Sequence, residues 1–275
     1  MGPKRLQGPC DSYLGEGLRA LAKGENSLAA EAFYKAFETD PTRIDALKYM
    51  CEALLAEESY DQAVQIYEML VEMDRQDHLS RFNLAVVYSR LKRFGEAEQV
   101  YAELLCERQD YVRARYNLAV LYQGQGKLSE AAKQWQEVIR QSPDLSSARA
   151  CLGQVYLDLG QARRAMLQYA EAAKLRPKEA GAWTNLAEAS KAAGFLGRAH
   201  VAMQRAVELS SEDAGLWRRL GQLQLQLHRS TGRRELLDCA CESWQRSLSL
   251  DGNQQDVRDW LETYRTPRPA TKPGK

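Results

Sequence analysis

The sequence predicts an all-α fold built from stacked pairs of helices, and two observations carry that prediction. The octapeptide RFNLAVVY at 81–88 returns as RYNLAVLY at 115–122, 34 residues later. A repeat at this spacing indicates one supersecondary unit stacked on copies of itself. Alanine recurs at the same interval without insertion or deletion, at Ala29, Ala63, Ala97, Ala131, Ala165 and Ala199.

Each repeat predicts two helices that approach closely. In the fifth repeat, Leu152 and Tyr156 and then Ala165 and Tyr169 lie four residues apart, while Gly160 separates the two segments. Such spacing is typical of apolar faces on helices, and glycine favours a break between them. Small residues alternate with large ones along the period, which predicts helices packed closely enough for large side chains to fill the space beside small ones.

The pattern resembles the tetratricopeptide repeat family, whose signature is W-x-x-L-G-x-x-Y…A-x-x-x-F…A…P. The fifth repeat matches it at Leu152, Gly153, Tyr156, Ala165, Tyr169, Ala172 and Pro177. The first position of the signature is held by Trp183 and Trp217, but by Arg81, Arg115 and Arg149 in the third to fifth repeats. The resemblance implies a right-handed superhelix, an α-solenoid of about seven helix pairs plus a capping helix, that works by binding proteins.

The period also predicts the boundaries along the chain. Residues 1–9 form a short extension, and a capping helix at 255–265 carries Val257, Trp260, Leu261 and Tyr264 on one face. Residues 266–275 are expected to be a disordered basic tail, and HRSTGRR at 228–234 is expected to lengthen the turn inside the seventh repeat. The seven repeats are predicted at 10–43, 44–77, 78–111, 112–145, 146–179, 180–213 and 214–254.

No pattern in the sequence points to catalysis. There is no phosphate-binding glycine loop and no serine in a nucleophile elbow. The six cysteines hold unrelated positions in their repeats and the three histidines lie far apart, so we expect no cofactor, no metal site and no disulfide. The chain is predicted not to be an enzyme, with buried, reduced cysteines.

Charge and hydropathy exclude several partners. Charged residues make up 27% of the chain and the formal net charge is +1, so no basic field predicts binding to nucleic acid or to a membrane surface. No apolar run approaches the roughly 18 residues of a membrane span, and MGPKRLQGPC lacks the hydrophobic stretch of a signal peptide. The expected location is the cytoplasm.

The resemblance also implies which positions face the concave groove. Asparagine offers a donor and an acceptor together, which suits a peptide backbone. The series partly resembles the asparagine ladder in the repeat arm of O-GlcNAc transferase, although Cys151 interrupts it. We therefore predict a peptide-binding groove whose exposed apolar floor is flanked by these amides. Its residues are Phe82, Asn83, Val86, Arg113, Tyr116, Asn117, Val120 and Asn185.

Two readings of the function stay open, and the partner is not identified. The first is an adaptor or scaffold that holds an extended peptide or a partner protein in the groove. The alternative is the substrate-presenting arm of a larger enzyme, such as a glycosyltransferase, whose catalytic part lies elsewhere. The clamp that some family members use for chaperone C-terminal tails is not expected here, because Glu52 follows Lys48 where the clamp needs asparagine. The arginines at the first signature position are expected to cover apolar surface or to form a positive row for an acidic partner.

Overall fold

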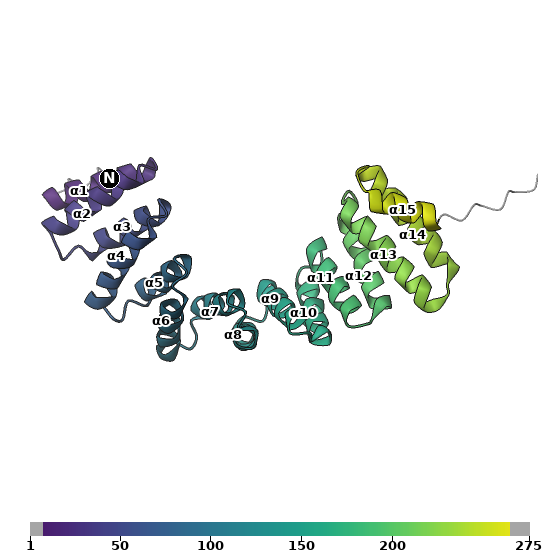
Figure 1. Ribbon diagram of the computed structural model, residues 1–275. Helices are drawn as coiled ribbons and strands as arrows, with labels where there is room; N and C mark the ends of the chain where they lie inside the picture. The colour runs from purple at the N-terminus through teal and green to yellow at the C-terminus, as the bar shows by residue number, and fades with distance from the viewer. Residues whose placement is uncertain (1–7, 265–275) are drawn as a thin grey trace, which may run out of the picture. The chain divides into compact units, whose positions relative to one another are not determined.

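A computed structural model describes residues 8–264, and within that range the chain forms fifteen α-helices and no strand (Figure 1). The all-α prediction is confirmed. The helices are α1 (Pro9–Ala22), α2 (Asn26–Thr39), α3 (Ile44–Ala56), α4 (Tyr60–Met73), α5 (His78–Arg90), α6 (Phe94–Glu107), α7 (Val112–Gly124), α8 (Leu128–Gln141), α9 (Ser146–Asp158), α10 (Ala162–Leu175), α11 (Ala180–Ala192), α12 (Leu196–Leu209), α13 (Ala214–Thr231), α14 (Arg234–Leu250) and α15 (Gln255–Tyr264).

The chain divides into two compact units after Gln125. The N-terminal unit contains α1 to α7, and the C-terminal unit contains α8 to α15. Within each unit, every helix packs on the helix before it. The boundary falls inside the fourth repeat, where the period runs on without a gap, so the sequence pattern gives no sign of it.

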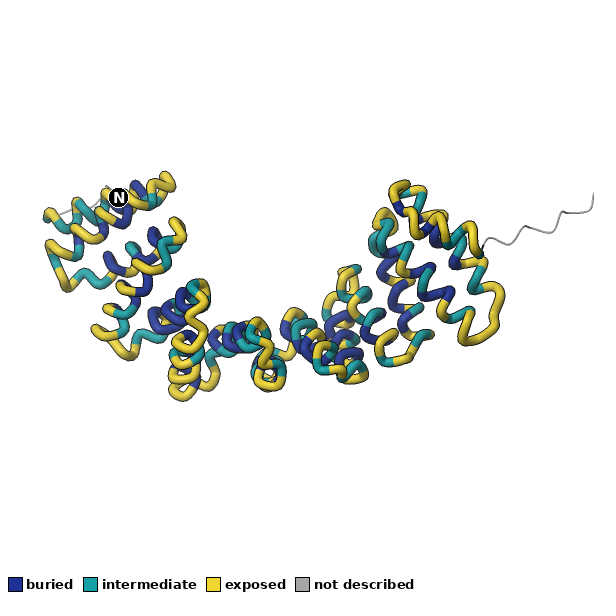
Figure 2. Tube along the Cα trace, viewed as in Figure 1, coloured by how far each residue is buried: buried dark blue, intermediate teal, exposed yellow. Residues whose placement is uncertain are grey.

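The repeated alanines set the register of the helix pairs. Ala29, Ala63, Ala97, Ala131, Ala165 and Ala199 are all fully buried, and Figure 2 shows buried segments recurring along the helices of each unit. On the first helices, glycine occupies positions where the second helix of the pair leaves no room for a side chain. A Cβ on Gly153 would lie 2.9 Å from the Tyr169 ring, and one on Gly221 would lie 2.4 Å from Trp244 Nε1. Small residues at these positions therefore let the paired helices approach.

The turn inside each of the first six repeats contains one residue with positive φ. The equivalent positions are Gly24, Glu58, Lys92, Gly126, Gly160 and Gly194, with φ between 58° and 82°. This region costs most side chains about 1–2 kcal/mol relative to glycine. The second and third repeats therefore keep a strained residue where the other four have glycine.

The arginines at the first signature position replace tryptophan by making the same hydrogen bond. Trp183 Nε1 donates to the carbonyl of Pro177 at 3.0 Å, and Arg149 Nε donates to the carbonyl of Pro143 at 3.1 Å. In each case the acceptor lies six residues earlier, directly after the preceding helix. The same bond recurs from Arg81, Arg115, Trp217 and Arg258.

These bonds argue against a row of open positive charge on the arginines. Arg81 is buried and its Nη1 lies 2.6 Å from Glu107 Oε2. Its guanidinium is therefore already neutralised by a carboxylate of α6. The side chain secures the turn between repeats, which is the task that the indole performs in the later repeats.

The sequence predicted the packing of the capping helix correctly but not the structure of the seventh repeat. The extra residues around 228–234 do not lengthen the turn as expected. They extend the helices, because α13 continues to Thr231 and α14 begins at Arg234. In α15 Val257 is fully buried, and the Trp260 ring lies 5.3 Å from the Trp244 ring. The predicted basic tail at 266–275 and most of the extension at 1–9 lie outside the described residues.

Candidate peptide-binding site

A pocket opens among α5, α6 and α7 of the N-terminal unit, where three of the predicted residues meet. Val86, Asn117 and Val120 line it together with Ser89 and other residues of these helices, and its volume is about 430 Å³. Val120 is 48% exposed, so part of the apolar surface is open to solvent. In Figure 1 the first helices α1, α3, α5 and α7 follow one another along one side of this unit.

Phe82 does not form the open floor that the sequence suggested. It is only 5% exposed, and its ring packs 6.2 Å from Tyr101 and 5.6 Å from Tyr111. The Arg113 guanidinium covers the ring at 5.0 Å from its centroid. The prediction that Phe82 is exposed is wrong, because residues of the neighbouring turn and of α7 cover it. Arg113 itself stays exposed, with a cation–π contact beneath it.

The two neighbouring asparagines act on tyrosines of the preceding repeats. Asn117 Nδ2 donates to the Tyr101 hydroxyl at 3.3 Å. Burial raises the pKa of Tyr67, and the Asn83 amide beside it acts in the opposite direction. Burial raises the pKa of Tyr101, while the hydrogen bonds from Asn117 and Ser89 act in the opposite direction. The Asn117 amide therefore satisfies a buried hydroxyl of the solenoid itself. A bound peptide would contact an amide that its hydrogen bond to Tyr101 has already oriented.

The predicted residues do not gather in one place. Asn185 belongs to the C-terminal unit, where it is exposed and lines a pocket of about 410 Å³ with Thr184 and Arg219. The remaining predicted residue, Tyr116, is half-buried on α7. The structure thus groups Val86, Asn117 and Val120 around one pocket and places Asn185 in another unit.

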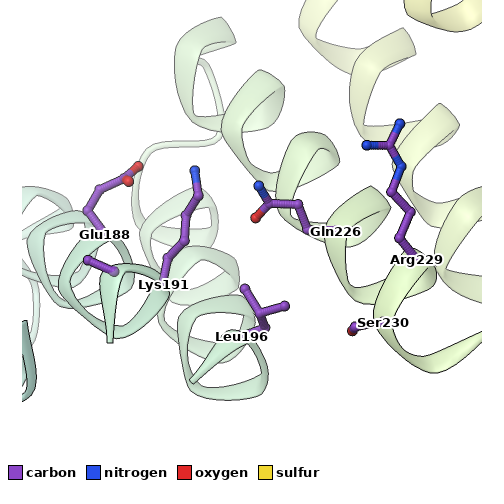
Figure 3. Close-up of a pocket in the computed structure, with 7 residues that line it drawn as sticks. Glu188, Lys191, Leu196, Gln226, Arg229 and Ser230 are labelled. Carbon is purple, nitrogen blue, oxygen red and sulfur yellow. The ribbon is translucent and has the colours of Figure 1, made fainter. Parts of the chain in front are cut away.

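A further pocket on the C-terminal unit was not anticipated from the sequence. It has a volume of about 640 Å³, and Figure 3 shows Lys191 of α11 and Arg229 of α13 projecting into the same space with Gln226 between them. Arg229 Nη2 also donates to the Tyr264 hydroxyl at 2.6 Å. Arg229 reaches this place because α13 runs beyond the length of the other first helices. The signal was the insertion at 228–234, which was interpreted as a loop.

Within residues 8–264, no group of three His, Cys, Asp or Glu side chains could hold a metal ion. In the same range, no helix combines the length and the apolar character needed to cross a bilayer. The cysteines are free thiols, but only Cys51 is buried, whereas Cys106 and Cys239 are exposed. The expectation of generally buried cysteines is therefore wrong.

Comparisons with known proteins agree with the helix-pair architecture. One family model described as Tetratricopeptide repeat matches residues 20–85 and 88–155, and a second with the same description matches 148–179. No curated protein matches the chain.

Solved structures show the same fold at low sequence identity. The C-terminal part of a TPR repeat-containing protein from Cytophaga hutchinsonii aligns with a TM-score of 0.76 at 15% identity, covering 90% of this chain and 99% of that chain. A tetratricopeptide repeat protein from Parabacteroides merdae aligns at 0.61 and 15%, covering 94% and 99%. YrrB, described as a TPR protein with an unusual peptide-binding site, aligns at 0.59 and 16%, covering 73% and 98%.

Proposed function

Because the chain belongs to the tetratricopeptide repeat family, we propose that it is a non-catalytic scaffold that binds an extended peptide of a partner protein in the α5–α7 pocket. The observation that carries the proposal is the pocket itself. It combines apolar surface from Val86 and Val120 with the polar atoms of Ser89 and Asn117. A few polar groups set in apolar surface are the usual composition of a ligand site.

The peptide-binding description of YrrB supports this assignment by analogy of fold. The site residues proposed for this chain are Val86, Asn117 and Val120 at the pocket, with Arg113 and Tyr116 beside it on α7. Phe82 supports the site by packing against Tyr101, and Asn83 does so through its polar interaction with Tyr67. The amide of Asn117 would offer its carbonyl oxygen to a peptide N–H and its second Nδ2 hydrogen to a peptide carbonyl, because only one of its two N–H groups donates to Tyr101.

The proposal places the protein in a reducing compartment, the cytoplasm. Its support is the set of six free thiols, two of which are exposed. Exposed thiols persist where glutathione and thioredoxin keep cysteines reduced. Neither nucleic acid nor membrane is part of the proposal, because the net charge of +1 offers no field for either.

The test is a comparative pull-down from the source cell with quantitative mass spectrometry. The bait variant is Val120→Glu, which puts a carboxylate on an exposed position of the pocket and should leave folding intact. The variant is expected to lose the partner protein that wild type captures. Fluorescence anisotropy on the binding peptide of that partner should then show at least about tenfold weaker binding, or about 1.4 kcal/mol.

Leu28→Glu serves as the matched control. Leu28 is 58% exposed on α2 and lies outside the pocket, so the same kind of change is made elsewhere on the same unit. The control should retain every partner that wild type captures. If Val120→Glu also retains them all, the α5–α7 pocket is not the binding site.

A further inference from the structure

The C-terminal unit carries a second surface, an apolar groove between α10 and α12 with α11 as its floor. The groove has a volume of about 440 Å³, and Leu167, Ala170, Leu186 and Val201 are among its lining residues. Leu167 and Val201 hold equivalent positions in successive repeats and are 58% and 64% exposed. Apolar side chains exposed side by side, rather than singly, mark an interaction surface.

Within the C-terminal unit, this groove lies on a different face from the two pockets described there. Residues three or four apart share one side of a helix, so α11 presents separate sets of side chains. Trp183, Leu186 and Ser190 face the groove, whereas Asn185, Glu188 and Lys191 line the pockets on the other side. A partner in the groove would not compete for those residues.

Arg198 lines the groove, and Arg163 lies beside it across the ring of Phe195. Arg163 and Arg198 lie over the ring of Phe195, at 5.7 Å and 5.5 Å from its centroid. Neither forms an ion pair within residues 8–264, whereas Arg205 further along α12 is paired with Glu208 at 2.7 Å. Both arginines without an ion pair lie in the first turn of their helix, where the helix dipole disfavours a cation. A carboxylate supplied by a partner would offset this unfavourable interaction.

Because the groove offers few polar groups, it favours a partner that binds as a helix over one that binds as an extended peptide. Apart from the Trp183 indole, which already donates to Pro177, only Ser190 and Arg198 among the lining residues carry polar side chains. The buried Ser190 hydroxyl has no hydrogen-bond partner within the described residues. An extended peptide would leave most of its backbone N–H and C=O groups unsatisfied there. A helix satisfies its own backbone and offers apolar side chains at i, i+3 and i+4.

The charge at the end of the groove indicates the chemistry of its occupant. Arg163 and Arg198 both contact the Phe195 ring and neither forms an ion pair within residues 8–264. Charge complementarity therefore favours a partner that carries a carboxylate at this point. We propose that the α10–α12 groove docks an amphipathic helix of a partner protein, with its apolar face on Leu167 and Val201 and an acidic residue between Arg163 and Arg198.

A designed peptide tests this proposal without knowledge of the natural partner. The probe is a fluorescein-labelled peptide of about 16 residues, long enough to form a helix, with leucines on one face and glutamates flanking them. Its counterpart replaces every glutamate with lysine. Fluorescence anisotropy with the full chain should show at least about tenfold tighter binding of the glutamate peptide.

Three variants locate the binding. Val201→Arg should weaken the glutamate peptide at least about tenfold, and the double change Arg163→Glu with Arg198→Glu should reverse the preference toward the lysine peptide. Arg205→Glu, on the same helix but outside the groove, should change neither affinity. Circular dichroism checks that each variant retains its helices.

The proposal is overturned if both peptides bind wild type equally, if neither binds, or if charge reversal leaves the preference unchanged. It is also overturned if analytical ultracentrifugation shows a wild-type dimer that Val201→Arg dissociates, because a second copy of the chain would then cover the groove. None of these outcomes depends on the α5–α7 pocket.

Discussion

Asn117 donates its side-chain N–H to the hydroxyl of Tyr101 at 3.3 Å, joining α7 to α6 across the seam between the third and fourth repeats. One repeat earlier, the Asn83 amide lies beside the Tyr67 hydroxyl and lowers its pKa against the larger effect of burial. From the sequence these amides were expected to face a bound peptide. The structure makes them part of the seam, so their removal has a stability cost that any binding assay must take into account.

Asn117→Ala should therefore lower the free energy of unfolding by about 1–2 kcal/mol, because a buried tyrosine hydroxyl loses a partner. Urea denaturation of Asn117→Ala, Tyr101→Phe and the double variant forms a double-mutant cycle. A coupling energy of about 0.5–1.5 kcal/mol is expected for the pair. An additive double variant would show that the two side chains do not interact in solution.

Arg149→Trp should preserve stability, because the indole N–H can donate to the carbonyl of Pro143 as Trp183 does to Pro177. Arg149→Leu keeps an apolar stem but removes the donor, and it should cost about 0.5–1.5 kcal/mol. The melting temperatures of the two variants give the comparison. Equal melting temperatures would mean that the hydrogen bond adds nothing to the packing.

Lys92→Gly should stabilise the chain by about 1 kcal/mol, because Lys92 has a φ of 59° that glycine adopts without strain. Gly160→Ala should destabilise it by a similar amount, since φ at Gly160 is 72° and nothing else lies near the added methyl. Both free energies come from urea titrations. Gly95→Ala is the control, because Gly95 lies within α6 with open space around it; alanine there should be neutral or stabilising. Effects of the same sign at positions 92 and 160 would contradict the prediction.

Stability should fall as the pH drops below about 6.5, in part because of His200. Burial lowers the pKa of His200 below its ordinary value of 6.5, so the unfolded chain takes up a proton before the folded chain does. The stabilising effect is therefore complete above pH 6.5 and is lost toward the lower, folded pKa. His200→Gln should reduce the difference between urea midpoints at about pH 7.5 and about pH 5.5. An unchanged difference would exclude His200 as a contributor.

The register of the helix pairs was predictable because a fixed period puts equivalent residues of every repeat in the same structural position. Ala165 and Ala199 are buried because each occupies the same crossing of paired helices, and Trp260 covers Trp244 because a last repeat exposes an apolar face. Phe82 could not be placed in this way. Its burial depends on Tyr111 and Arg113, which belong to the next turn and helix and differ from repeat to repeat.

The other unpredicted features share that cause. The pocket beside Arg229 exists because α13 is longer than the first helices of the other repeats. The repeat pattern predicts only what the repeats share, so it could not predict this extension. The division after Gln125 likewise leaves no mark in the sequence pattern. Periodicity identifies what the repeats have in common, whereas binding surfaces arise where individual repeats differ.

The capping helix α15 bears on whether molecules could polymerise end to end. Its Arg258 makes the same backward hydrogen bond as the first helices of earlier repeats, so α15 occupies the place of one more first helix. Among its exposed side chains are Asp259 and Glu262, whereas Asp256 pairs with Arg218 of α13 at 3.4 Å. A second molecule that stacked on α15 over Asp259 and Glu262 would have to desolvate their carboxylates. Charge therefore disfavours end-to-end stacking on this helix.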